Sequence, residues 1–160
     1  MVIILMGVAG AGKTTIGRGL AAELGWPFYD ADDLHPRANV EKMRRGVPLT
    51  DEDRRPWLAA LRELIAGCLA RDKNAVLACS ALKAEYREYL LLDERVKLVY
   101  LKGDYELIQA RLRARRDHFM PPEMLASQFA TLEEPADALQ IDVALPLAQN
   151  LELIRNRLGI

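Results

Sequence analysis

A glycine loop between an apolar run and a helical pattern constrains the fold of this chain more than any other feature. Val2 to Leu5 is continuously apolar, which is typical of a buried strand in a parallel sheet. The loop GVAGAGKT, residues 7–14, matches the pattern G-x-x-x-x-G-K-[ST]. Ile16, Leu20 and Leu24 then recur at helical spacing. A strand, a loop and a helix in this order predict a P-loop, which binds the phosphates of a nucleoside triphosphate.

The residue types in this loop suit phosphate binding. Glycines allow several backbone N–H groups to approach phosphate oxygens where a Cβ would interfere, and the helix that begins at Lys13 adds the partial positive charge of its N-terminus. Lys13 is expected to reach the β- and γ-phosphates, and the Thr14 hydroxyl to ligate Mg²⁺. The alternative, a chance glycine-rich turn, is disfavoured by the complete strand–loop–helix order. The expected nucleotide-binding residues of the loop are Gly7, Val8, Ala9, Gly10, Ala11, Gly12, Lys13, Thr14 and Thr15.

Apolar segments alternate with helical patterns along the rest of the chain. Strands are predicted at 27–30, 75–79, 96–101 and 139–143, and helices from about Thr50, at 82–92, from Asp104 to about Arg116, and at 147–158. This alternation predicts one α/β domain over residues 1–160, with a parallel sheet covered by helices on both faces. Ligands bind at the carboxyl ends of such strands. The site is therefore expected at 7–14, 30–35, 80–83 and 102–104.

The charge balance argues against polyanionic partners. The chain has 22 basic and 23 acidic residues and a net charge of -1, so neither nucleic acid nor an anionic membrane surface is expected as a partner. No apolar run approaches the roughly 20 residues that span a bilayer, and the first residues lack the features of a signal peptide. Cys68 and Cys79 give neither a disulfide framework nor metal-ligand spacing. We expect a cytoplasmic protein.

Two acidic residues follow the second predicted strand. Asp30 and Asp32 alternate, so a strand that continued through them would point both toward the P-loop. Asp30 can then hold a magnesium-bound water, and Asp32 can orient or deprotonate an acceptor hydroxyl. The alternative is an Asp-rich turn that caps the next helix. A kinase is favoured over two other classes of P-loop protein. The sequence lacks the N-K-x-D and D-x-x-G elements of a GTPase, and the predicted strand 75–79 is followed by Ser80 instead of the acid typical of an ATPase.

Beyond the P-loop, the chain resembles the gluconokinase family. The matching segments are DADDLHPRANVEKM at 30–43, GVPLTDEDR at 46–54, PWL at 56–58, CSALK at 79–83, YR at 86–87, YLKGD at 100–104, HFMP at 118–121, SQF at 127–129 and LE at 132–133. The resemblance runs from the P-loop to about Pro135, and departs from the family pattern at Asp33, where an apolar or aromatic residue is frequent.

The resemblance implies a fold, an activity and an assembly. The fold is the three-layer α/β sandwich of P-loop NTPases, related to shikimate and adenylate kinases, with a five-stranded parallel sheet and a small helical lid at about 116–130. The activity is ATP- and Mg²⁺-dependent phosphorylation of D-gluconate to 6-phospho-D-gluconate. A homodimer is also implied. The residues themselves leave open a kinase for another small sugar acid or a non-catalytic ATP-binding module.

A sugar acid requires polar groups for its hydroxyls and a cation for its carboxylate. Ser80 and Lys83 lie at the carboxyl end of a predicted central strand, and Arg87 follows Lys83 by four residues on the same helix face. These three residues are expected to bind the substrate. For Lys83 and Arg87 the alternative is a solvated helix face beside Glu85 and Glu88.

Two further substrate contacts come from the resemblance, which implies a substrate flap at about residues 34–56. Arg54 is the expected clamp in this flap, and His35 lines it. The alternative role for Arg54 is an ion pair with Asp51, three residues earlier.

Arginines gather before the expected lid. Arg111 and Arg115 are four residues apart and share a helix face, and a mobile segment that carries arginines suits phosphoryl transfer because it excludes water and neutralises the transferred group. The alternative is favourable charge at a helix C-terminus. The resemblance places Arg115 at the phosphates and Arg111 near the adenine, and Pro146 is expected at the edge of the adenine pocket. The predicted catalytic residues are Lys13, Asp32 and Arg115.

Overall fold

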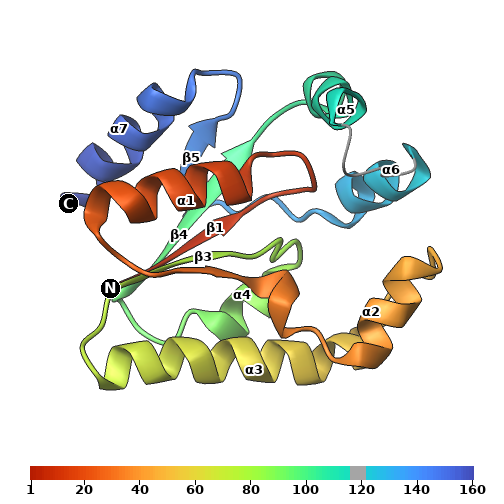
Figure 1. Ribbon diagram of the computed structural model, residues 1–160, viewed down its shortest axis with the longest axis horizontal. Helices are drawn as coiled ribbons and strands as arrows, with labels where there is room; N and C mark the ends of the chain where they lie inside the picture. The colour runs from red at the N-terminus through yellow and green to blue at the C-terminus, as the bar shows by residue number, and fades with distance from the viewer. Residues whose placement is uncertain (116–121) are drawn as a thin grey trace.

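The computed structural model describes residues 1–115 and 122–160 and has a parallel sheet at its centre (Figure 1). The strands are β1 (Val2–Met6), β2 (Phe28–Asp30), β3 (Ala75–Ala78), β4 (Val96–Lys102) and β5 (Leu139–Asp142). They lie in the order β2-β3-β1-β4-β5, and every neighbouring pair is parallel. The predicted five-stranded parallel sheet is confirmed, and β1 with its P-loop lies at its centre.

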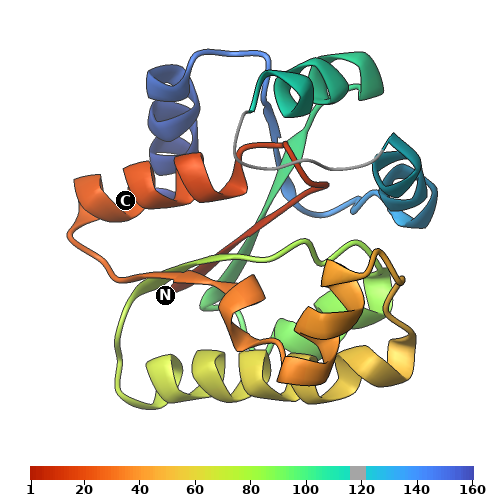
Figure 2. The same ribbon diagram turned by 45° about the vertical axis from the view of Figure 1, so that its right-hand side comes forward.

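Helices cover both faces of the sheet. The helices are α1 (Lys13–Leu24), the 3₁₀ turn η1 (Ala31–Leu34), α2 (Arg37–Arg44), α3 (Asp51–Ala70), α4 (Ala84–Leu90), α5 (Tyr105–Ala114), α6 (Pro122–Thr131) and α7 (Leu147–Leu158). Figures 1 and 2 show α1 and α7 over one face and α3 and α4 over the other. The predicted three-layer sandwich is thus observed. Within the described residues, no helix has the length and apolarity to cross a bilayer.

The burial of β1 explains why its sequence is continuously apolar. Successive strand side chains point to opposite faces. Ile4 belongs to the apolar cluster with Trp57 and Leu61 of α3, whereas Ile3 belongs to the cluster with Leu20 of α1. Both faces of β1 are therefore interior, and a polar residue on either face would be buried.

The termini of two helices follow local rules. The Thr50 hydroxyl accepts from the Asp53 N–H and the Asp53 carboxylate accepts from the Thr50 N–H, which is the capping box expected from the sequence. The helix predicted to run to about Arg116 ends instead at Ala114, with Arg115 as its C-cap in an extended conformation. Residues 116–121, the first part of the expected lid, lie outside the described residues.

Candidate active site

The P-loop joins β1 to α1 and contacts the end of β3. The N–H of Gly7 donates to the carbonyl of Ser80 at 3.3 Å, which ties the start of the loop to the segment that follows β3. Gly10 and Gly12 have φ values of 80° and 97°, a left-handed conformation that favours glycine. A Cβ on Gly10 would lie 2.8 Å from Cγ of Leu112 in α5. The loop can close against α5 because this position is glycine.

Lys13 lies over the loop that precedes it. Its Nζ donates to the carbonyls of Gly7 and Val8, both at 2.9 Å. Burial lowers the pKa of the Lys13 ammonium, and the neighbouring charges of Asp32 and Asp30 oppose that shift. The Nζ of Lys13 is therefore held at the start of α1, where a phosphate would bind, and the charges of Asp32 and Asp30 act on it there.

Oxygen ligands meet beside Lys13. The hydroxyl of Thr14, in α1, donates to Oδ2 of Asp30, the last residue of β2, at 3.4 Å. A hydroxyl and a carboxylate are the hard oxygen ligands that Mg²⁺ prefers. Thr14 and Asp30, the two predicted metal ligands, are thus brought together, and their chemistry fits that ion.

Asp32 reaches the same site from a turn. The strand β2 ends at Asp30, and Oδ1 of Asp30 accepts from the Asp32 N–H at 3.0 Å at the start of η1. The strand therefore does not continue through Asp32, and the alternation that was expected to bring the two carboxylates together is absent. The turn η1 brings Asp30 and Asp32 together instead. Desolvation raises the pKa of the Asp32 carboxyl, the Asp30 charge raises it further, and the charge of Lys13 opposes both effects.

Arg54 and Lys83, two of the residues expected to bind the substrate, are brought together at Asp51. Nζ of Lys83 donates to Oδ1 of Asp51 at 2.8 Å, and NH1 of Arg54 lies 3.8 Å from the same oxygen. The hydroxyl of Tyr86 also donates to Asp51 and accepts from Arg54 at 3.5 Å. Ser80 is half-buried at the start of the loop that leads to Lys83. Sequence reasoning missed Tyr86 in this cluster, although its position three residues after Lys83 on one helix was a usable signal.

Arg87 has a different position. Its side chain is buried, and NH1 donates to the carbonyls of Ala81 and Leu82 at 2.9 and 3.0 Å. Ala81 has a left-handed backbone with φ of 43°, so these bonds stabilise an unusual turn. Arg87 thus supports the loop that carries Ser80 and Lys83, and its geometry does not fit the expected contact with a substrate carboxylate.

His35 packs inside the flap. Its ring stacks on Trp57 with centroids 4.5 Å apart, and its Nδ1 lies 3.3 Å from Nδ2 of Asn39. Burial, with a smaller effect from Arg54, lowers the pKa of His35 to about 4, so the ring is neutral near pH 7. Asn39 also donates to the Asp53 carbonyl, which fastens α2 to the start of α3. Figure 2 shows η1 and α2 beside the N-terminal part of α3.

The predicted nucleotide residues outside the P-loop lie on α5 and after β5. Arg111 donates to the carbonyl of Val143, in the segment between β5 and the N-cap of α7, which is Pro146. Arg111 is thus fastened to the segment that carries Pro146. Arg115 is exposed at the end of α5, and its charge contributes to the lowered pKa of Lys13.

Helix α6 and the segment just after it contact two parts of the site. Oε1 of Gln128 accepts from the Ala9 N–H at 2.7 Å. Just after the helix, Oε2 of Glu133 accepts from the Ala84 N–H at 3.2 Å. Sequence reasoning assigned no site role to either residue. Both occur in segments that carry the family resemblance, which was the available signal.

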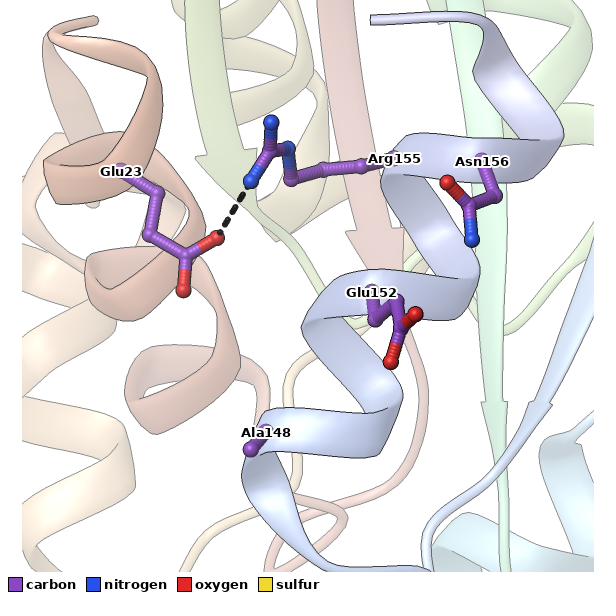
Figure 3. A pocket seen from close by; sticks show the side chains of 5 residues that line it. All are labelled: Glu23, Ala148, Glu152, Arg155 and Asn156. Atoms are coloured by element: carbon purple, nitrogen blue, oxygen red, sulfur yellow. Dashed lines mark hydrogen bonds and ion pairs between the residues drawn. The ribbon is translucent and has the colours of Figure 1, made fainter.

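A surface pocket lies elsewhere, between α1 and α7 (Figure 3). Its lining residues are Glu23, Ala148, Glu152, Arg155 and Asn156. Arg155 pairs with Glu23 at 3.2 Å across the pocket. Glu23 is in the last turn of α1, whereas the P-loop adjoins the first turn, and none of the predicted site residues lines this pocket.

The fold and site define a P-loop kinase of small molecules. The family model described as Shikimate kinase matches residues 9–136. The chain is 42% identical to the thermoresistant gluconokinase of Escherichia coli K12, over 96% of this chain and 93% of that one. It is 48% identical to the gluconokinase of Gluconobacter oxydans, over 84% and 76% of the two chains. A crystal structure of a gluconokinase from Sinorhizobium meliloti superimposes with a TM-score of 0.89 at 40% identity, covering 99% of this chain and 91% of that one. The chain belongs to the gluconokinase family.

Proposed function

We propose that the protein transfers the γ-phosphoryl group of ATP to the 6-hydroxyl of D-gluconate, giving 6-phospho-D-gluconate and ADP. One observation carries the proposal. The P-loop with Lys13, the carboxylate of Asp32 and the segment that carries Lys83 follow β1, β2 and β3 of one parallel sheet, and Arg54 of α3 meets Lys83 at Asp51. The chain belongs to the gluconokinase family. Such a site suits a phosphoryl donor, an acceptor hydroxyl and a carboxylate.

The P-loop and Lys13 hold the phosphates in this proposal. The loop amides and the start of α1 supply donors and partial positive charge, and Nζ of Lys13 exchanges the carbonyls of Gly7 and Val8 for phosphate oxygens. Thr14 and Asp30 hold Mg²⁺, which neutralises charge on the phosphate oxygens.

Asp32 orients the acceptor. Its carboxylate accepts the proton of the 6-hydroxyl as that oxygen forms a bond to the γ-phosphorus, and the bond from the γ-phosphorus to the β,γ-bridging oxygen breaks. The raised pKa of Asp32 makes it a stronger base than an ordinary carboxylate. Arg115 neutralises the transferred group, and α6, the described part of the lid expected at about 116–130, helps to exclude water, which would otherwise compete as the acceptor.

Measurement of ADP release with different acceptors tests this proposal. The acceptors are gluconate, other sugar acids, shikimate, a nucleoside monophosphate and no acceptor, with 6-phosphogluconate detected by its dehydrogenase. Turnover with gluconate supports the proposal. Turnover with shikimate alone, or with a different sugar acid in preference to gluconate, contradicts the assigned substrate. ATP binding without transfer to any acceptor contradicts the catalytic function.

Four accompanying proposals have separate tests. Dependence on Mg²⁺ is tested by chelation and titration of the cation, a homodimer by light scattering during size-exclusion chromatography, and a cytoplasmic location by fractionation of the source cells. Residues 1–160 are proposed to form one domain with a flap at about 34–56 and the lid, and one cooperative unfolding transition is the expected result.

A further inference from the structure

Two hydrogen-bond donors and a guanidinium gather around one carboxylate oxygen at the substrate side of the site. Oδ1 of Asp51 accepts from Nζ of Lys83 at 2.8 Å and from the hydroxyl of Tyr86, and NH1 of Arg54 lies 3.8 Å away. Asp51 and Arg54 are in the first turns of α3, Lys83 is the N-cap of α4, and Tyr86 is in α4. These donors from two helices form a site for an anion, and the chain's own carboxylate occupies it.

The donors are fixed more firmly than the acid. The side chains of Arg54 and Lys83 are 28% and 27% exposed, whereas that of Asp51 is 58% exposed. Both cations lie over the buried ring of Tyr86, with 5.9 and 5.6 Å to its centroid. Asp51 can rotate into solvent at the surface, so the carboxylate is the exchangeable member of the cluster.

The cluster keeps a surplus of positive charge. Two cations share Asp51, and nearby His35 is neutral because its pKa is lowered to about 4. Hydrogen bonds from Lys83 and Tyr86 lower the pKa of Asp51, and the bond with Asp51 raises the pKa of Lys83, so both groups are charged near pH 7. Glu85 is a weaker neighbour of Lys83. An incoming carboxylate can therefore replace Asp51 without leaving either cation unpaired.

We infer that Arg54, Lys83 and Tyr86 form the subsite for the acceptor's carboxylate, and that Asp51 fills this subsite until the substrate displaces it. The inference rests on the proposed function, since a sugar acid supplies the displacing group. The cluster adjoins the phosphate site, because the segment from Ser80 to Lys83 begins where Ser80 accepts from the Gly7 N–H. Asp51 then acts in substrate selection, because a neutral polyol lacks the charge that displaces it.

The test compares Asp51→Asn with the wild type, using gluconate and its neutral amide, gluconamide, as acceptors at saturating ATP. Asparagine keeps an oxygen that accepts from Lys83 and Tyr86 but removes the competing charge. We expect the KM for gluconate to fall about three- to five-fold, as for loss of a partly exposed ion pair, with kcat and the KM for gluconamide changed less than about two-fold. Raising the salt concentration should shrink the difference in gluconate KM.

Two further variants complete the design. Glu52→Gln removes a charge from the neighbouring exposed position of α3 and should leave the KM for gluconate unchanged. Lys83→Met should raise that KM and reduce the effect of Asp51→Asn in the double variant, since Arg54 still pairs with Asp51. A KM for gluconate that rises in Asp51→Asn, or falls equally for gluconamide, overturns the inference while leaving gluconate kinase activity established. A wild type without turnover on gluconate overturns the proposed function and this inference together.

Discussion

The side-chain carbonyl of Gln128 in α6 accepts a hydrogen bond from the backbone N–H of Ala9 in the P-loop, at 2.7 Å. A backbone N–H carries one hydrogen, so this group cannot donate fully to Gln128 and to a phosphate at the same time. The contact therefore links the position of α6 to the occupancy of the P-loop.

Gln128→Glu should weaken nucleotide binding. A carboxylate at this position accepts more strongly from the Ala9 N–H and repels the triphosphate. We expect the Kd of a non-hydrolysable ATP analogue, measured by calorimetry, to rise about five- to ten-fold, corresponding to roughly 1 to 1.4 kcal/mol. Ser127→Ala, at the exposed neighbouring position, is the matched control and should leave the Kd unchanged. If Gln128→Glu binds the analogue as tightly as the wild type, the side chain leaves the phosphate site when the nucleotide enters.

Asp32→Asn should separate catalysis from stability. Loss of the base should lower kcat about a hundred- to ten-thousand-fold, with little change in the Kd for ATP. The pKa of Asp32 is raised in the folded state, so the folded protein retains its proton more readily than the unfolded chain. The free energy of unfolding therefore falls as the pH rises through the pKa of Asp32 in the unfolded chain and then in the folded protein. Because asparagine carries no charge, Asp32→Asn should raise the Tm at pH 7 but not well below pH 4. Equal losses of turnover and ATP affinity would argue against this role.

The fold and the phosphate site were largely predictable because their signals are local. The apolar run 2–5, the loop 7–14 and the helical spacing after it occur within one short segment, and βαβ rules then fix the sheet. Thr14 and Asp30 come from different segments, but both follow strands of that sheet, so their meeting also followed from topology.

The remaining site residues depend on tertiary contacts that spacing does not encode. Lys83 and Arg87 occupy one helix face by spacing, yet the left-handed turn at Ala81 draws Arg87 inward to its carbonyls. Gln128 meets Ala9 across 119 positions of the chain. The spacing of Arg54 and Asp51 did predict their ion pair as an alternative. It did not predict that Lys83 and Tyr86 also bind Asp51.

The half-buried His35 predicts an acid-sensitive flap. The pKa of His35 is lowered to about 4 in the folded protein, from 6.5 in the unfolded chain. Between these values the unfolded chain binds a proton that the folded chain does not, so the free energy of unfolding falls as pH is lowered from about 6.5 to 4. His35→Gln should remove on the order of 2 kcal/mol of this pH dependence, after allowance for partial exposure. Urea unfolding of both proteins at several pH values measures it, and parallel pH curves would contradict the assignment.

Gly10→Ala should destabilise the P-loop more than Gly12→Ala. Both positions have a left-handed backbone, so each alanine costs about 1 kcal/mol in strain. At Gly10 the new Cβ also meets Leu112 at 2.8 Å, whereas at Gly12 the nearest atom is Cδ1 of Ile16 at 3.7 Å. The clash with buried Leu112 should add about 1 to 3 kcal/mol to the loss in the free energy of unfolding. Adding Leu112→Ala to each glycine variant tests whether the clash is the cause. The space left by the Leu112 side chain should offset part of the loss in the free energy of unfolding with Gly10→Ala and none of it with Gly12→Ala. Equal effects of the two alanines would show that backbone strain alone sets the cost.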